Sequence, residues 1–282
     1  MEHEVLAKKF KQEIKEVLKR DLSEDVLNRT FTSIKTRIDK DIKEGYFNSM
    51  CSTLAFGIGI HGGDYPKQLI LNGDTEGWKY ITRYLLWSQH IIEKRNKWFD
   101  VSNRNMGSIL AFSQLWEMAE LKPIIRAYFQ EYYEEEKEKY KKKESHHLFV
   151  ALVFDLLEDG SYEEAMFQFL PTGSVYQTFL ENWNTTDDAL YQKLIFDLCD
   201  AHIYSCLDVK NKMTEILSHD LIPYDIKLIE KLRTKQGLSA PKVAHPLLET
   251  ALYDIPKEMI PWNLAEDEVY QYLLLKEEQY LK

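Results

Sequence analysis

Cys199, His202 and Cys206 lie within one predicted helix, and their residue types are those of a metal site. At 100° per residue they fall within about 60° of arc, on the apolar face of that helix. About 10.5 Å of helical rise separates the two cysteines, too far for a disulfide or for two sulfurs on one tetrahedral zinc. We therefore expect buried cysteines and a hydrogen-bonded core histidine there, with no metal.

Two further patterns resemble cofactor motifs but lack the surroundings that those motifs need. "GIGIHG" (57–62) matches G-x-G-x-x-G, yet Pro66 follows closely and too little chain remains for the crossover helix of a dinucleotide fold. We expect these glycines to end a helix. Glu144 and His147 form one Glu-x-x-His pair, whereas a di-metal bundle needs two. We expect His146 and His147 to lie at a solvated helix start.

Local catalytic motifs do not occur in the sequence. It has no nucleophile elbow, no P-loop, no H-E-x-x-H and no Asp-rich metal loop. Their absence favours a protein that is not an enzyme, and we expect no cofactor. An active site assembled from distant residues stays open as an alternative.

Acidic side chains are concentrated in residues 144–208, which hold twelve of them and one basic residue, Lys193. Ser161 and Thr186 are expected to cap the helices that two of the acidic pairs open. A field of this sign repels nucleic acid and attracts cationic partners, although plain solubility is the alternative explanation. The carboxylates that we expect to contact a partner are Glu158, Asp159, Glu163, Glu164, Asp187 and Asp188.

Charge also divides the chain into two halves. Residues 1–143 carry 25 basic and 22 acidic side chains, a net charge of +3, whereas residues 144–282 carry 11 and 24, a net charge of −13. The charged stretch near 137–145 is the expected seam between an N-terminal helical half and an acidic C-terminal half. The two halves could equally pack as one domain.

Composition indicates a cytoplasmic protein with a hydrophobic core. The 282 residues are 44% hydrophobic and 29% charged, which is ordinary for a globular protein. The charged N-terminus has no signal segment, no stretch is long enough to span a membrane, and an odd count of three cysteines suits a reducing compartment. We expect no binding to membranes or nucleic acid. No feature indicates an oligomeric state.

Helical periodicity runs through almost the whole chain, and no period-2 strand is apparent. Low counts of 11 Gly and 8 Pro favour long helices. We expect an all-α array of about twelve amphipathic helices packed in antiparallel pairs, similar to a helical repeat. The expected helices span residues 3–20, 24–43, 46–60, 75–98, 104–120, 123–143, 146–158, 161–170, 172–182, 186–207, 209–218, 223–236 and 265–280.

The segment "LIPYDIKLIEKLRTKQGLSAPKVAHPLLETALYDIP" (221–256) carries the clearest helix signals. Pro223 fits the first helical position, Arg233 lies in a basic last turn, and Gly237 fits the left-handed residue after the helix. An extended segment follows because prolines hold the preceding residues out of the α region. This extended segment ends in His245, Pro246, Leu247 and Leu248, whose leucines can anchor it on the helices.

The order of these elements resembles the C-terminal region of the immunity protein 49 family of bacterial polymorphic toxin systems. "LIPYDIKLIEKLR", "GLSAPKVAHPLL" and "IP" match its Pro-opened helix, its Gly-Leu turn and its His-Pro-Leu-Leu segment. "FDLCDAHIYSCLD" (196–208) is similar to the Asp-x-His helix of the family through Asp200 and His202. The resemblance covers about the last 90 residues of the chain, and the matched positions transfer as markers of the fold.

The resemblance implies a cytosolic antidote that binds and blocks a cognate toxin without being an enzyme. Such toxins are often nucleases with basic surfaces, and an acidic inhibitor surface would imitate nucleic acid and speed association. One alternative is a helical-repeat scaffold for another protein, with a groove of exposed aromatics such as Trp78, Trp87 and Trp98. Another is a helical-bundle enzyme with a deep pocket of ionisable groups or a bound metal.

Overall fold

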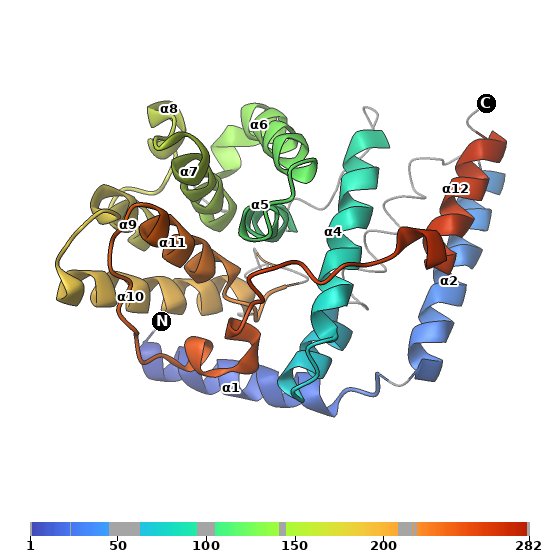
Figure 1. The fold of residues 1–282 in the computed structure, drawn as a ribbon, viewed down its shortest axis with the longest axis horizontal. Helices are drawn as coiled ribbons and strands as arrows, with labels where there is room; N and C mark the ends of the chain where they lie inside the picture. Colours follow the sequence, from blue (N-terminus) through green and yellow to red (C-terminus); the bar gives the residue numbers. More distant parts are fainter. Residues whose placement is uncertain are drawn as a thin grey trace. The chain divides into compact units, whose positions relative to one another are not determined.

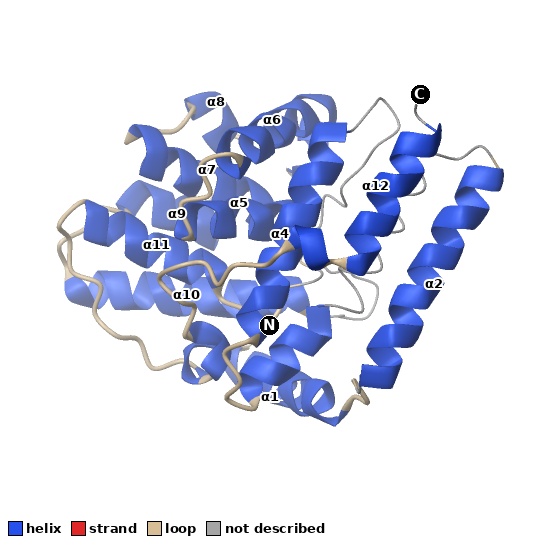
Figure 2. Cartoon of the chain, turned by 45° about the vertical axis from the view of Figure 1, so that its right-hand side comes forward, coloured by secondary structure: helices blue, strands red, loops and turns tan. Residues whose placement is uncertain are grey.

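The computed structural model describes residues 2–22, 24–44, 63–94, 105–140, 145–207, 216 and 219–280 (Figures 1 and 2). Every regular element in these ranges is helical, and no strand occurs in them. The expected all-α fold is confirmed for this part of the chain, whereas the antiparallel pairing of neighbouring helices stays a prediction. None of the described helices is long and apolar enough to cross a membrane.

The helices follow most of the expected ranges to within a few residues. A helix over residues 63–71 was not expected, because Gly63 and Pro66 suggested a break. Pro66 lies within these helical residues, so the proline does not break the helix there. The expected helix over 46–60 and most of the one over 209–218 lie outside the described residues.

The α-helices are α1 (His3–Lys19), α2 (Glu24–Lys43), α4 (Gly77–Lys94), α5 (Met106–Leu115), α6 (Leu121–Tyr140), α7 (Ser145–Asp159), α8 (Glu164–Phe167), α9 (Val175–Asn182), α10 (Asp188–Cys206), α11 (Tyr224–Lys235) and α12 (Glu268–Tyr280). The 3-10 helices whose bounds are described are η2 (Pro246–Glu249), η3 (Ala251–Tyr253) and η4 (Leu264–Glu266).

The chain forms two compact units. Unit 1 comprises Met1–Lys15 and Arg104–Lys257, and unit 2 comprises Glu16–Asn103 and Glu258–Lys282. These bounds do not coincide with the halves 1–143 and 144–282 expected from the charge pattern. Unit 1 contains His3, the helices α5 to α11 and the segment before η2, which together form the sites described below.

The centre of unit 1 is formed by α5, α7 and α11, which contact one another (Figure 1). Every side chain of α7 from His146 to Leu157 is buried, as expected for a helix that is apolar all round. α6, α8 and α9 pack on α7, and α10 packs on α9 and α11. This arrangement brings the first turns of α7 and α11 and the last turns of α10 into one core.

The ends of α11 match the signals in the sequence closely. Pro223 immediately precedes the helix, one residue before the first helical position that we expected for it. Gly237 has a φ of +69°, which confirms the expected left-handed residue after the helix.

Arg233 joins two loops of unit 1 through backbone hydrogen bonds. Its side chain is buried, and its guanidinium donates to the carbonyl oxygens of Trp183 at 2.7 Å, Thr185 at 3.0 Å and Ser239 at 2.7 Å. A buried charge is costly without such partners, so these bonds fix the loop before α10 against the loop after α11.

Unit 2 is organised around one buried carboxylate. α2 and α12 lie side by side in both views (Figures 1 and 2). Asp267, just before α12, accepts hydrogen bonds from Arg83 Nε and Nη2 on α4 at 2.6 and 2.7 Å. The indole N–H groups of Trp87 and Trp262 donate to the same carboxylate at 3.0 Å each. Asp267 therefore ties the start of α12 to α4 within this unit.

Candidate functional site

Two clusters of two histidines and one aspartate lie in unit 1, and helix α10 contributes one residue to each. The outer cluster consists of His3, Asp200 and His245, and the inner cluster consists of His146, His202 and Asp225. Asp200 and His202 are two residues apart, which separates them by about 200° around the helix. The "Asp-x-His" pattern therefore serves two different sites on opposite faces of α10.

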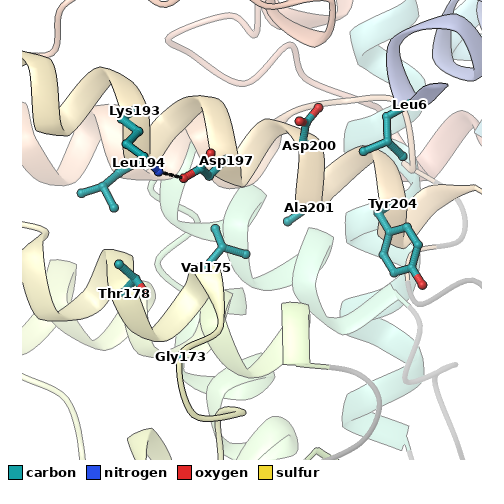
Figure 3. A pocket seen from close by; sticks show the side chains of 10 residues that line it. All are labelled: Leu6, Gly173, Val175, Thr178, Lys193, Leu194, Asp197, Asp200, Ala201 and Tyr204. Atoms are coloured by element: carbon teal, nitrogen blue, oxygen red, sulfur yellow. Dashed lines mark hydrogen bonds and ion pairs between the residues drawn. The ribbon is translucent and has the colours of Figure 1, made fainter. Parts of the chain in front are cut away.

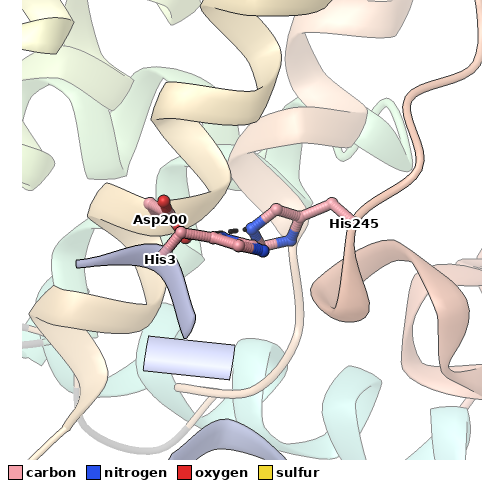
Figure 4. Close-up of side chains that lie close together, drawn as sticks. All are labelled: His3, Asp200 and His245. Atoms are coloured by element: carbon pink, nitrogen blue, oxygen red, sulfur yellow. Dashed lines mark hydrogen bonds and ion pairs between the residues drawn. The ribbon is translucent and has the colours of Figure 1, made fainter. Parts of the chain in front are cut away.

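The outer cluster joins α1 and the segment before η2 to α10 (Figure 4). His3 Nδ1 donates to Asp200 Oδ1 at 2.9 Å, and His245 Nε2 donates to the same oxygen at 3.1 Å. His3 and Asp200 are partly exposed, whereas His245 is buried. Two donors on one carboxylate oxygen hold the start of α1 beside the His-Pro segment.

The tautomer of His245 is fixed by the backbone. Its Nδ1 accepts a hydrogen bond from the N–H of Leu247 at 3.2 Å, which makes His245 the N-cap of η2. A neutral imidazole has one lone pair and one N–H, so Nε2 carries the proton that it donates to Asp200. Burial lowers the pKa of His245, although the Asp200 carboxylate opposes this effect. This ring therefore has no lone pair left for a metal.

The inner cluster is buried deeply and spans three helices. His146 comes from the first turn of α7, His202 from the last turns of α10 and Asp225 from the first turn of α11. His146 Nε2 lies 3.1 Å from Asp225 Oδ2, and His202 Nδ1 lies 2.9 Å from Asp225 Oδ1. The exposed fractions of the three side chains are 0%, 0% and 1%.

The charges of the inner cluster depend on one another. Burial disfavours the imidazolium of His202, but the nearby Asp225 carboxylate outweighs this effect and holds the pKa of His202 well above its usual value. Burial also disfavours the charged form of Asp225, yet His202 and His146 hold the pKa of that carboxyl well below its usual value. Without a metal, the cluster is a buried ion pair with a second histidine beside it.

The surroundings of the inner cluster fix its rings. His202 Nε2 donates to the carbonyl oxygen of Asp220 at 2.9 Å, and Cys206 Sγ also donates to that oxygen. The ring of Tyr224 meets the rings of His146 and His202 edge to face, with centroids 5.8 and 5.7 Å apart. Since no substrate can reach side chains this deeply buried, the inner cluster is suited to hold helices together.

The structure corrects one expectation and confirms another. The expectation of a solvated helix start at His146 and His147 is wrong, because both side chains are buried. Cys199, His202 and Cys206 are buried and His202 is hydrogen-bonded, as expected. The signal that could have placed the histidines inside is the apolar run after them, since a helix that is apolar all round is enclosed from its first turn. The partnership with Asp225 had no local signal.

Part of the acidic set lines one groove of unit 1, with a volume of about 710 Å³. The groove lies where α6 meets the end of α7 and the segment leading into α8. Its charged lining residues are Lys122, Arg126, Asp155, Glu158, Asp159 and Glu163. Glu164, at the start of α8, directly follows this set in the chain.

Both cations of this groove, Lys122 and Arg126, form ion pairs with carboxylates of the same chain. Lys122 Nζ lies 2.8 Å from Glu158 and 3.0 Å from Glu117, and its hydrogen bond lowers the pKa of Glu158. Arg126 donates from Nε and Nη2 to both oxygens of Asp155 at 2.7 and 2.8 Å. Two cations and four carboxylates line the groove, a net charge of −2.

The third acidic pair has local structural roles. Asp187 is the N-cap of α10, and its side chain accepts hydrogen bonds from two backbone N–H groups of that helix. Asp188 accepts a hydrogen bond from Ser239 at 2.7 Å. Neither residue lines the acidic groove. Asp187 and Glu163 occupy the capping positions that we had expected for Thr186 and Ser161.

The residues of the family-like segment are placed as structural elements. His245 and Asp200 belong to the outer cluster, and His202 belongs to the inner one. Pro246 begins η2, Leu247 is buried and Leu248 is partly buried. The anchoring role expected of the two leucines is thus confirmed for Leu247.

A second groove beside α10 has little chemistry of its own (Figure 3). Lys193 and Asp197, which both line it, form an ion pair with each other at 2.5 Å. Asp200 also reaches this groove, although its Oδ1 atom already accepts from His3 and His245. The remaining lining side chains are mostly apolar or small, so the groove presents no free reactive group.

The aromatic groove expected for a scaffold protein finds no support in the described residues. Trp78 and Trp87 are each 1% exposed, and Trp98 lies outside the described part of the chain, as does the "GIGIHG" motif (57–62). Glu144 also lies outside it.

No model of a protein family, no curated protein and no solved structure matches this chain.

Proposed function

We propose that this protein is a non-enzymatic immunity protein of the cytoplasm that neutralises a cognate toxin by binding a basic surface of the toxin in its acidic groove. The observation that carries the proposal is the uncompensated negative charge of that groove. Asp159 and Glu163 are exposed, and neither side chain has a cation partner among the described residues. Glu164, also exposed, extends the same acidic edge.

The pairing inside the groove explains why a partner cation would bind there. Lys122 pairs with Glu117 and Glu158, and Arg126 pairs with Asp155. Neither cation can move to neutralise the remaining groove carboxylates without breaking those pairs. An arginine or lysine from a partner would meet Asp159 and Glu163, for which the described part of the chain offers no competing cation. Complementary charge of this kind raises association rates and makes binding sensitive to salt.

The resemblance of residues 221–256 to an immunity family supports the same proposal, although no family model matches the chain. That segment supplies His245 of the outer cluster, Asp225 of the inner cluster and the η2 turn, which have structural roles. The proposed contact surface is a different part of unit 1.

The proposal is tested by co-expressing the full chain with the proteins encoded beside it and isolating any complex. We expect a complex with a basic toxin domain that weakens steeply between low and physiological salt. Protection of cells without any complex would contradict binding as the mechanism and would favour an enzyme.

A pair of matched variants tests the surface. The triple change Asp159→Asn, Glu163→Gln, Glu164→Gln should weaken the complex about 10-fold and flatten its salt dependence, since exposed charge pairs contribute about 0.2–1 kcal/mol each. The control changes three exposed carboxylates outside the groove, Asp254→Asn, Glu258→Gln and Glu266→Gln, and alters the net charge equally. Equal affinity of the two variants would overturn the acidic groove as the contact surface.

A further inference from the structure

The inner cluster has the donor types and the spacing of a transition-metal site. Its three ligand atoms, two imidazole nitrogens and one carboxylate oxygen, lie within 4.8 Å of one another. The contacts from His146 Nε2 and His202 Nδ1 to Asp225 measure 3.1 and 2.9 Å. Donors at 2.0–2.1 Å from zinc lie about 3.3 Å apart in a tetrahedron and about 2.9 Å apart at a right angle, which brackets these values.

The orientation of His202 is that of a metal ligand. Its Nε2 donates to the backbone carbonyl of Asp220 at 2.9 Å, the outer hydrogen bond that commonly orients histidines bound to metals. Its Nδ1 lies close to Asp225 Oδ1, yet within the described part of the chain this nitrogen has no hydrogen-bond partner. His202 Nδ1 therefore lies against the Asp225 carboxylate without a well-aligned hydrogen bond to it, an arrangement that fits two ligands of one ion.

From this geometry we infer that the inner cluster binds one first-row divalent transition ion, with Zn²⁺ the best match, through His146 Nε2, His202 Nδ1 and the Asp225 carboxylate. Imidazole ligands select such ions, whereas Mg²⁺ and Ca²⁺ prefer sites made of oxygen atoms. Binding replaces the proton on His202 Nδ1, while Nε2 keeps its proton and its bond to Asp220.

The expected role of the ion is structural. Its ligands come from α7, α10 and α11, so one ion joins three helices that are far apart in the sequence. Their exposed fractions of 0–1% leave no access for a substrate. Because sites of this kind do not exist in an unfolded chain, metal affinity adds directly to folding stability. This inference goes beyond toxin binding and does not depend on it, because the groove residues Asp159 and Glu163 are not part of the site.

The outer cluster provides an internal control with the same residue types. His245 Nδ1 already accepts the N–H of Leu247, so its remaining nitrogen carries a proton and cannot bind an ion. Zinc binding at the inner cluster but not at the outer cluster would show that the orientation of the histidines, and not the residue types alone, makes the site.

The first experiment uses the full chain after chelator treatment and titrates it with Zn²⁺ alone, and separately with Co²⁺. We expect one Zn²⁺ per chain after dialysis and the visible absorption of Co²⁺ bound by nitrogen and oxygen. An ion concentration about 100-fold above Kd should raise Tm by about 5 °C or more. No bound ion, or a bound ion without any rise in Tm, would overturn the inference.

Substitutions in the inner and the outer cluster test which residues bind the ion. Asp225→Asn keeps the volume and should weaken Zn²⁺ binding about 100-fold or more, beyond the loss typical of an outer partner. Asp200→Asn, in the outer cluster, should leave Zn²⁺ affinity unchanged. His146→Gln serves as a second ligand variant, and circular dichroism shows which variants fold. Unchanged affinity in both ligand variants, or its loss in Asp200→Asn alone, would overturn the assignment; if neither ligand variant folds, the wild-type titration decides.

Discussion

The outer and inner clusters contain the same residue types and share helix α10, yet they differ in what surrounds the imidazoles. In the outer cluster a backbone N–H occupies one nitrogen of His245, and the other is left as a donor to Asp200. In the inner cluster a backbone carbonyl occupies one nitrogen of His202, and the other faces Asp225. A main-chain N–H uses the lone pair of His245, whereas a main-chain carbonyl accepts the N–H of His202. The type of main-chain group beside each ring thus decides whether the other ring nitrogen can bind an ion.

Burial is the second difference between the clusters. Asp200 is partly exposed and can be hydrated when a partner is lost, whereas Asp225 is enclosed by α7, α10 and α11. The same substitution should therefore cost much more in the inner cluster. Four predictions, in order of decreasing effect, test this comparison.

Removing the inner carboxylate should have the largest effect. Asp225→Ala removes the carboxylate that pairs with two buried histidines, and breaking a buried charge pair in this way costs about 3–5 kcal/mol. The free energy of unfolding from urea titration of chelator-treated protein measures this loss. Asp254→Ala, at an exposed position, is the control. A loss below about 1 kcal/mol would mean that the inner cluster does not hold its helices together.

Adding a methyl group at Gly107, which lies against His146 and His147, should have the next largest effect on stability. A Cβ at Gly107 on α5 would lie 2.6 Å from His147 Nδ1 and 3.4 Å from His146 Nδ1. Gly107→Ala should therefore destabilise by about 1–3 kcal/mol, the usual cost of overpacking. Alanine is normally the better helix former, so a gain in stability would show that the rings can move away freely.

Removing the outer carboxylate should cost less than removing the inner one. Asp200→Ala leaves the buried Nε2–H of His245 without an acceptor, a penalty of about 1–3 kcal/mol. The partly exposed His3 can turn to water. Parallel urea titrations of Asp200→Ala and Asp225→Ala give the difference, and equal losses would refute the role of burial.

The pH dependence of the outer cluster should be the smallest effect. The folded pKa of His245 is lowered from 6.5, so the unfolded chain binds more protons below this pH and stability falls as the pH drops through 6.5. Asp200, His3 and Glu249 are the charged or titratable groups acting on this ring.

His245→Asn keeps a side-chain acceptor for the N–H of Leu247 and removes the titration. The stability advantage of the wild type over this variant should shrink as the pH falls from 7 to 5, as measured by urea titration at each pH. An advantage that grows toward acid pH would mean that the histidine is stabilised in its charged form.

Much of the fold could be predicted from local patterns. Pro223, Asp225 and Gly237 delimited α11 nearly to the residue, because capping and left-handed glycine conformations depend on a few neighbouring residues. The helical residues 63–71 were missed, because Pro66 was given a breaking role that it does not have there.

The inner cluster could not be found in this way. His146, His202 and Asp225 meet through the packing of three helices, and no spacing in the sequence encodes that meeting. Reading α10 alone even pointed away from a metal, because Cys199 and Cys206 are too far apart. The acidic pairs were visible in the sequence, but which of them are neutralised by Lys122 or used as caps depends on tertiary structure.

The hydrogen bonds of Asp267 have a consequence for biosynthesis. Arg83 and Trp87 are 184 and 180 residues ahead of this carboxylate in the chain. At about 5–20 residues per second, a ribosome needs about 10–40 s to make the segment between Arg83 and Asp267. During that interval α4 carries a cation and an indole without their acceptor, while most of unit 1 emerges and can fold. Unit 2 is interrupted by most of unit 1 and is completed last, so its early residues wait longest on the nascent chain for their partners.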